Sequence, residues 1–352
     1  MKYVSYALRA SRARVFCGVV LALGAQSSAL AGAGTLTTVV TPLTDVVTYS
    51  DGGSGLVAYV GYKVAIANAG GNTINNIVFT GATTVTDGDE KAVFVSAQGA
   101  NCTVTNATQT AIQCTIGQLT AGQGYPAFAV FFKAPEKDAV TPLPSGDSVG
   151  FAGVTLYAEG TGGVLNSKPQ NSTGNWSATG VPLGTFNPTL IKSAVPNGGG
   201  KFFTGNGVAS TAQDPFTTSV VVPAGPTFTT VTISESPAGG VNCSNFLTCY
   251  QSQITIPGSF TPYLTIVLRE DAANIKPGTK IESVLISYVD AGNVAHDVGL
   301  CASPTTPLTN GLPCIASRVY YKSKTVPGWT PELDGDFEWT LINLVNGGYI
   351  VR

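Results

Sequence analysis

The carboxylates near the C-terminus are the residues whose spacing could support hydrolytic chemistry. The string DGDFEW places Asp334, Asp336 and Glu338 at alternate positions, so in a strand they would share one face. A glycosidase needs two carboxyl groups that face each other across a sugar, and a single strand face does not supply the opposite side. We therefore assign no catalytic residue, and a secreted hydrolase that acts through Asp336 or Glu338 remains an unfavoured alternative.

The same acidic strings are candidates for binding calcium, which takes hard oxygen ligands from loops. The candidate ligands are Asp87, Asp89 and Glu90 in DGDE, and Asp334 and Asp336 in DGD. Neither string has the twelve-residue spacing of an EF-hand. Calcium is thus the one cofactor that the sequence offers, and we otherwise expect none.

Nucleophilic catalysis and aromatic stacking have less support from the sequence. His296 is the only histidine, and a lone histidine beside glycine turns does not define a catalytic triad. Four aromatic residues outside the apolar strands could stack on sugar rings or form an interface, although aromatic residues more often lie in a core: Trp176, Tyr320, Tyr321 and Trp329.

Six cysteines remain after the N-terminal segment, and they fall into three close pairs. The pairs enclose CTVTNATQTAIQC, CSNFLTC and CASPTTPLTNGLPC, that is, Cys102 and Cys114, Cys243 and Cys249, Cys301 and Cys314. An even number in an exported chain predicts disulfides. We favour sequential pairing, while other pairings of the six stay open. No pair has the C-x-x-C spacing typical of zinc sites.

The N-terminus has the order of a secretory signal peptide. Lys2, Arg9, Arg12 and Arg14 precede the apolar run VFCGVVLALG, and Ala29 and Ala31 occupy the small-residue positions of a cleavage site. The ten-residue run is too short for a bilayer span, which needs about 20 residues. We expect residues 1–31 to be removed and the mature protein to be secreted or held at a bacterial cell surface.

Composition predicts an all-β fold and argues against nucleic-acid binding. Charged residues make up only 11% of the chain, and 42 Gly and 21 Pro punctuate stretches rich in Thr and Val, a pattern typical of strands and turns. Cleavage would leave 14 Lys and Arg against 20 Asp and Glu, a net charge of −6 without a basic stripe. No long apolar segment follows the signal peptide, so we expect no transmembrane span.

Alternating apolar residues divide the mature chain into two halves. The segment 56–68 places Tyr62, Val64 and Ile66 on one strand face, and the second half repeats such alternation at Leu264, Ile266 and Leu268. In the string DFEWTLINL, Phe337, Trp339 and Leu341 share a face. We predict two Ig-like antiparallel β-sandwich domains, over 32–160 and 201–352. The Gly-, Ser- and Asn-rich segment 161–200 is expected to be a linker or long loop.

The first half resembles a bacterial surface repeat. The strings YKVAIANAGGNTINNIVFTG and NCTVTNATQTAIQCTIGQLTAGQGYPAFAVFFKAP resemble the Ig-like repeat known as domain of unknown function eleven, over about residues 36–160. The matching positions are Asn68 and Gly70, Cys102 and Cys114, Gly117 and Leu119, and Gly122. The string TGATTVTDGDE stands where that family often has an Asp-x-x-Pro turn. The strings GDFEW and NGGYIV loosely resemble the C-terminal regions of uncharacterised exported proteobacterial proteins.

The resemblance implies a surface or secreted protein whose domains act as spacers, scaffolds or adhesive modules. We therefore expect a non-enzymatic structural or adhesive protein that binds other surface proteins or copies of itself, and that could self-assemble. A carbohydrate- or ligand-binding module, with glycans as partners, is the alternative.

Overall fold

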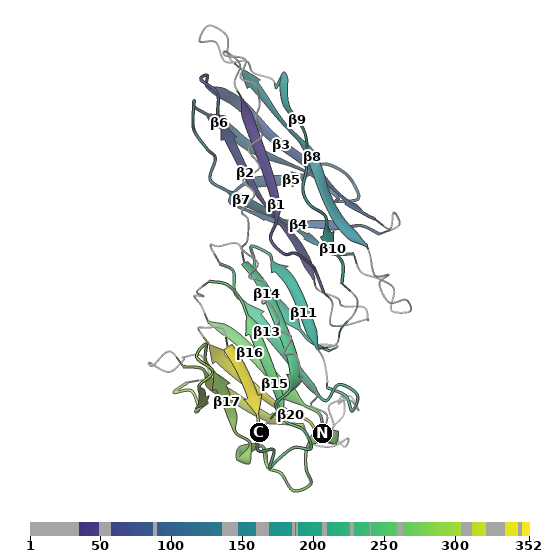
Figure 1. Cartoon of the computed structure of the whole chain (residues 1–352), viewed down its shortest axis with the longest axis vertical. Coiled ribbons are helices and arrows are strands. Elements are labelled where there is room, and N and C mark those ends of the chain that lie inside the picture. Colours follow the sequence, from purple (N-terminus) through teal and green to yellow (C-terminus); the bar gives the residue numbers. More distant parts are fainter. Residues whose placement is uncertain are drawn as a thin grey trace, which may run out of the picture.

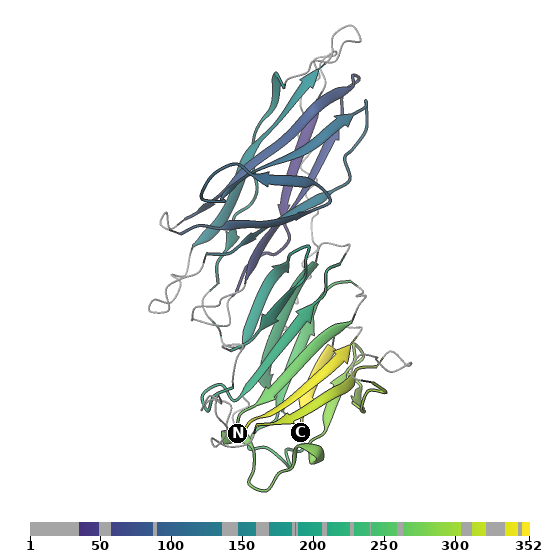
Figure 2. The same ribbon diagram turned by 180° about the vertical axis from the view of Figure 1, so that it is seen from behind.

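The chain folds into two β-sandwiches that follow each other along the long axis of the molecule (Figures 1 and 2). The computed structural model describes residues 35–48, 58–86, 90–135, 147–159, 169–184, 187, 189–205, 210–225, 229–239, 241–258, 263–303, 312–321, 335–343 and 347–352. The ladders between the named strands are antiparallel. The prediction of an all-β sandwich fold is thus confirmed.

The first sandwich packs a four-stranded sheet against a six-stranded sheet. The four-stranded sheet has the order β1 (Leu36–Pro42), β2 (Tyr59–Asn68), β7 (Phe128–Lys133), β4 (Val93–Gln98). The six-stranded sheet has the order β10 (Val181–Pro182), β8 (Ser148–Glu159), β3 (Ile74–Val85), β6 (Ala111–Leu119), β5 (Asn101–Val104), and β9 (Asn171–Ser177) also pairs with β8.

The second sandwich has a six-stranded and a five-stranded sheet. The six-stranded sheet has the order β11 (Leu190–Val195), β14 (Thr229–Pro237), β15 (Tyr250–Thr255), β21 (Gly347–Val351), β17 (Ile286–Val289), β18 (Ala295–Asp297). The five-stranded sheet has the order β12 (Gly200–Phe203), β13 (Phe216–Val222), β16 (Leu264–Glu270), β20 (Phe337–Asn343), β19 (Cys314–Tyr320). Two short 3-10 helices, η1 (Ala272–Asn274) and η2 (Ile281–Ser283), connect strands.

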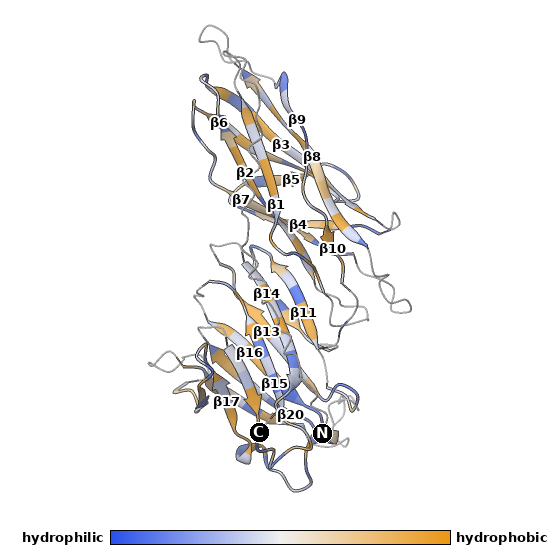
Figure 3. Cartoon of the chain, viewed as in Figure 1, coloured by the Kyte–Doolittle hydropathy of each residue, from blue (hydrophilic) through white to orange (hydrophobic). Residues whose placement is uncertain are grey.

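The apolar faces that the alternation predicts form the two cores. Along many strands, hydrophobic residues alternate with paler or hydrophilic ones (Figure 3). Tyr62, Val64 and Ile66 are buried in the first core, where the Tyr62 and Phe151 rings lie 5.0 Å apart. Leu264, Ile266 and Leu268 are buried in the second core, together with Phe337, Trp339 and Leu341.

The segment 161–200 differs from the linker or long loop expected from its composition. Within it, β9 and β10 pair with β8 of the first sandwich, and β11 pairs with β14 of the second. The strand β9 is almost entirely polar, so periodicity gave no sign of it. Hydrogen bonding to a neighbouring strand, rather than an apolar face, makes this segment extended.

The junction between the sandwiches is packed. Ala129 and Phe131 of β7 form a small buried cluster with Ala194 of β11, and Leu43 and Tyr59 pack against it. The Tyr59 ring also meets Phe202 edge-on, with 6.1 Å between the ring centroids. Side chains from both sandwiches therefore share one apolar contact.

Hydrogen bonds cross the same junction. The backbone N–H of Tyr59 donates to Ser193 Oγ at 2.7 Å, and that of Thr48 donates to the Lys192 carbonyl at 3.0 Å. The Gln98 amide donates to the Gly225 carbonyl at 2.7 Å. Lys192 also forms an ion pair with Asp45. These bonds fix the direction in which one sandwich leaves the other.

The cysteines pair in the order favoured from their spacing: Cys102–Cys114, Cys243–Cys249 and Cys301–Cys314. Cys102 and Cys114 stand opposite each other in the β5–β6 ladder, with Cα atoms 4.0 Å apart. Because disulfides persist in oxidising compartments, the three bonds indicate an extracytoplasmic environment. Among the residues described, no helix has the length and apolar character to cross a membrane.

We predict that replacing Cys102 and Cys114 together by serine lowers the free energy of unfolding by about 3 kcal/mol, because the bond closes a short loop in the unfolded chain. Guanidinium titration of the oxidised protein and the double variant measures this difference. The variant should keep its strand spectrum by circular dichroism. Equal midpoints for the two proteins would contradict the prediction.

Candidate functional site: a polar pocket on the second sandwich

The outer face of the five-stranded sheet carries a polar cavity of about 250 Å³. Strand alternation sends Phe202, Phe216 and Trp339 into the core and leaves their neighbours facing outward. The residues that line the cavity come from four adjacent strands, β12, β13, β16 and β20, and from the segments that follow β12 and β19. They are Lys201, Phe203, Thr204, Thr217, Thr218, Ser219, Val267, Arg269, Tyr321 and Glu338.

Strand register brings the polar members into a row. Thr217 of β13 stands opposite Arg269 of β16, and Arg269 stands opposite Glu338 of β20. A second row places Phe203 opposite Ser219, and Ser219 opposite Val267. Residues that are distant in the chain thus become neighbours on one surface.

An ion pair lines one side of the pocket. The Arg269 guanidinium donates to the Glu338 carboxylate through Nε at 3.1 Å and also through Nη2. Each of the two side chains is only 14% exposed, so the pair is shielded from solvent more than an ordinary surface ion pair. Donor and acceptor groups therefore lie side by side at the cavity wall.

Tyr321 completes this wall. Its hydroxyl donates to Glu338 Oε2 at 3.1 Å, and the Arg269 guanidinium carbon lies 5.8 Å from the centre of its ring. Burial, followed by the charge of Glu338, raises the pKa of Tyr321. The phenol therefore stays protonated, so it acts as a hydrogen-bond donor and presents a ring surface.

The floor of the pocket is backed by a buried acid. Thr204 Oγ1 donates to Glu235 Oε1 at 2.6 Å and accepts from the Thr218 N–H at 2.8 Å. Thr218 Oγ1 in turn donates to Ser252 Oγ at 2.9 Å. Glu235 is 8% exposed, and burial raises its pKa to about 8. The acid is therefore mostly protonated at neutral pH.

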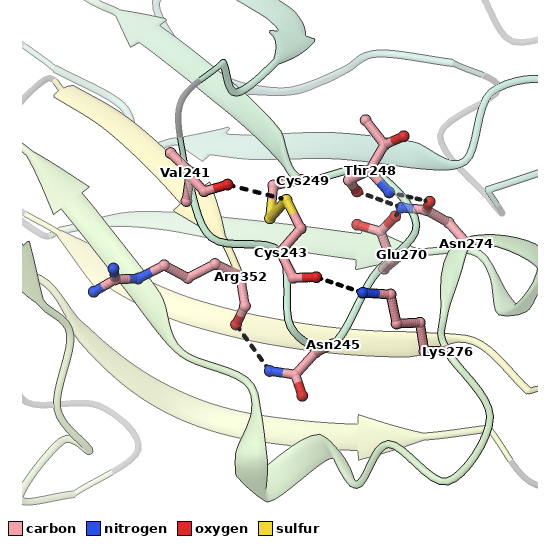
Figure 4. Close-up of a disulfide and its surroundings, with 9 residues drawn as sticks. All are labelled: Val241, Cys243, Asn245, Thr248, Cys249, Glu270, Asn274, Lys276 and Arg352. Atoms are coloured by element: carbon pink, nitrogen blue, oxygen red, sulfur yellow. Dashed lines mark hydrogen bonds between the residues drawn. A yellow bond between two sulfur atoms is a disulfide. The ribbon is translucent and has the colours of Figure 1, made fainter.

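A second buried acid lies beside the Cys243–Cys249 loop (Figure 4). Burial raises the pKa of Glu270 well above its ordinary value, and the Asn274 amide donates to its carboxyl group. Asn274 also donates to the Thr248 carbonyl at 2.7 Å and accepts from the Thr248 N–H at 2.9 Å. Lys276 Nζ donates to the Cys243 carbonyl at 2.6 Å. This network ties the disulfide loop to η1.

The acidic strings of the sequence do not assemble as their spacing suggests. Asp336 precedes β20 and is buried, where it accepts from Ser210 Oγ at 3.0 Å and from the Ala272 N–H at 3.1 Å. Glu338 instead lines the outer pocket. The prediction that these two share one strand face is therefore wrong, because the strand begins only at Phe337.

The structure describes only some of the residues predicted as calcium ligands. Asp87, Asp89 and Asp334 lie outside the described residues, whereas Glu90 is half-buried just before β4. Across the residues described, no three His, Cys, Asp or Glu side chains gather in a group that could hold a metal ion.

The aromatic candidates divide between core and surface. Trp176 packs on the first core, with its ring stacked 4.8 Å from that of Phe79. Tyr320 is 48% exposed and touches Phe337 edge-on. Tyr321 reaches the pocket, and Trp329 lies outside the described residues.

Sequence reasoning missed Lys201, Arg269, Thr217 and Ser219. The signal that could have found them is the polar character of the outward positions in strands whose inward positions are apolar. That signal identifies the outer face of the sheet. It does not predict which outward residues lie next to each other, because this depends on which strands pair and in which register.

The lone histidine forms part of a hairpin turn. His296 Nε2 lies 3.0 Å from the Asp290 carboxylate in the β17–β18 hairpin. This hydrogen bond is the largest cause that lowers the pKa of Asp290. The pair closes a turn.

Comparisons with known proteins add little. No family model matches the chain, and no curated protein matches it. A GH20 exo-β-N-acetylglucosaminidase from Vibrio harveyi is 11% identical with a TM-score of 0.23, over 46% of this chain and 20% of that one. The chain therefore spans about a fifth of the length of that enzyme.

Two further solved structures are similarly distant. The sixth cohesin of Acetivibrio cellulolyticus scaffoldin B is 13% identical with a TM-score of 0.23, over 42% of this chain and 96% of the cohesin. Spo0M, a sporulation control protein from Bacillus subtilis, is 10% identical with a TM-score of 0.18, over 63% of this chain and 80% of Spo0M. Scores this low carry no argument about this chain.

Proposed function

We propose that this chain is an exported, non-enzymatic structural or adhesive protein in which the first sandwich holds the second in a fixed direction. The observation that carries the proposal is the packed junction. An apolar cluster of Ala129, Phe131 and Ala194 and several hydrogen bonds cross it. Domains joined by flexible linkers move freely, whereas this junction makes the pair a rigid spacer, as an adhesive or scaffold protein requires.

The disulfides support the extracellular part of the proposal. Each one closes a short loop, and all three are retained only where thiols are oxidised. Together with the signal peptide predicted over residues 1–31, they favour release to the cell surface or the medium. Mass spectrometry of the secreted protein should find a chain that begins after Ala31.

A non-catalytic role agrees with the pocket chemistry. Glu338 is bonded to both Arg269 and Tyr321. Asp336, the other carboxylate of the hydrolase alternative, is bonded to Ser210 and the Ala272 N–H instead. The two carboxyl groups therefore do not face each other across the cavity, as glycoside hydrolysis needs.

Attachment of protein-coated beads tests the adhesive role. Beads that carry the oxidised mature chain should attach to intact cells of the source organism, and antibody should label the outside of those cells. Beads coated with reduced and alkylated chain are the control. Absence of both surface labelling and attachment would overturn the proposal.

A further inference from the structure

We infer that the pocket on the outer face of the five-stranded sheet binds one residue of an acidic saccharide, that is, a polyhydroxylated ring that carries a single carboxylate. The inference rests on the adhesive role proposed above, for which it names a partner. It draws on three features of the described residues: the Arg269–Glu338 pair, the Tyr321 and Phe203 surfaces, and Lys201 at the rim.

The ion pair fits a vicinal diol. Each sugar hydroxyl donates one hydrogen bond and accepts others. A guanidinium supplies five N–H donors, and a carboxylate offers about four acceptor positions. Arg269 and Glu338 stand opposite each other on neighbouring strands, so two adjacent hydroxyls can each meet a donor and an acceptor.

The remaining walls fit a ring. Tyr321, Phe203 and Val267 supply apolar surface, while Thr217 and Ser219 supply hydroxyl groups. Sugars have C–H faces that pack on aromatic rings, and polar edges that need hydrogen bonds. The cavity, at about 250 Å³, lies below the roughly 300–1,000 Å³ of pockets that enclose drug-sized molecules. It therefore has room for one ring.

The charge of the pocket selects an acid. Two cationic side chains, Lys201 and Arg269, stand against one carboxylate, Glu338. Arg269 is engaged with Glu338, whereas Lys201 is exposed and has no ionic or hydrogen-bond partner within the part of the chain that the structure describes. A carboxylate on the ligand would pair with Lys201. A phosphate dianion suits the site less, because it would lie near Glu338 and gain only one unpaired cation.

Calorimetric titration of the oxidised mature chain tests the inference. The probes are D-glucuronate and D-galacturonate, their neutral parents D-glucose and D-galactose, and inorganic phosphate. Uronates should bind, the neutral sugars should bind about fivefold more weakly, as expected for one exposed ion pair, and phosphate should not compete.

Two variants separate the parts of the site. Lys201→Gln should remove the preference for uronates, so that each uronate and its neutral parent bind with equal affinity. The double variant Arg269→Gln with Glu338→Gln keeps the net charge of the pocket, so it should keep the preference for uronates. Its affinity for every sugar should fall about tenfold, because the hydrogen bonds to the hydroxyls are weakened. Lys63→Gln, at an exposed position of β2, is the matched control. Lys201 is also exposed, so its variant keeps the test valid if the double variant fails to fold.

Equal affinity for uronates and neutral sugars, or no sugar binding by the folded protein, would overturn the inference. Cell attachment that persists unchanged in Lys201→Gln and in the double variant would also overturn it, while the adhesive role would stand. Weaker attachment by both variants, in parallel with their weaker uronate binding, supports the inference and the proposed role together.

Discussion

Replacing Glu235 by Gln is expected to raise the free energy of unfolding at pH 8 by about 4 kcal/mol and to leave it unchanged near pH 4. The side chain is buried behind the floor of the pocket, where Thr204 donates to its Oε1. Burial raises its pKa from 4.5 to about 8. Glutamine keeps the shape and the acceptor but never has to ionise.

The direction of this pH dependence follows from the number of protons that the folded and unfolded states bind. Between about pH 4.5 and pH 8 the folded state holds a proton on Glu235 that the unfolded state has released, so stability falls as pH rises through this window. Below pH 4.5 both states are protonated and the contribution is fully present. The raised pKa values of Asp214 and Asp336, each about 6, act in the same direction.

Guanidinium titrations at pH 4, 6 and 8 measure the effect. The unchanged protein should lose stability from pH 4 to pH 8, and the Glu235→Gln variant should lose much less. Glu282→Gln is the control, because Glu282 is exposed in η2. A Glu235→Gln variant whose stability falls with pH as steeply as that of the unchanged protein would contradict the account.

Gly61→Ala is expected to open the junction, because no side chain fits at this point. A Cβ atom at Gly61 would lie 2.7 Å from Leu43 Cδ1, 2.9 Å from Ala194 Cβ and 3.2 Å from the Phe131 ring. Leu43 and Phe131 belong to the first sandwich, and Ala194 belongs to the second. The methyl group therefore pushes the two apart, at a cost of about 1–3 kcal/mol.

Differential scanning calorimetry separates the outcomes. The unchanged protein should unfold in one transition, since the sandwiches stabilise each other across the junction. Gly61→Ala should split this into two transitions, or lower the transition temperature of one sandwich alone. Gly71→Ala is the matched control, because a Cβ there meets nothing within 4 Å. Identical traces for Gly61→Ala and the unchanged protein would contradict a stabilising junction.

Much of the fold follows from local patterns in the sequence. The alternation of Tyr62, Val64 and Ile66 correctly identified a buried face of β2, because each residue of a strand turns its side chain to the opposite side. The close cysteine pairs correctly predicted three disulfides, since hairpin ends and short loops bring near neighbours together.

The pocket and the junction depend instead on long-range pairing. Arg269 and Glu338 become neighbours only because β16 and β20 pair in one register, and a shift of one residue would turn either side chain into the core. Ala129 and Ala194 meet only after both sandwiches have formed. The polar strand β9 likewise depends on β8. No local pattern encodes such pairings.

The central claim is that the two sandwiches form one rigid unit, and small-angle X-ray scattering of the oxidised mature chain tests it most directly. The account predicts a profile that fits the single elongated arrangement of Figures 1 and 2, unchanged between low and moderate salt. A profile that requires an ensemble of orientations between the sandwiches would contradict it.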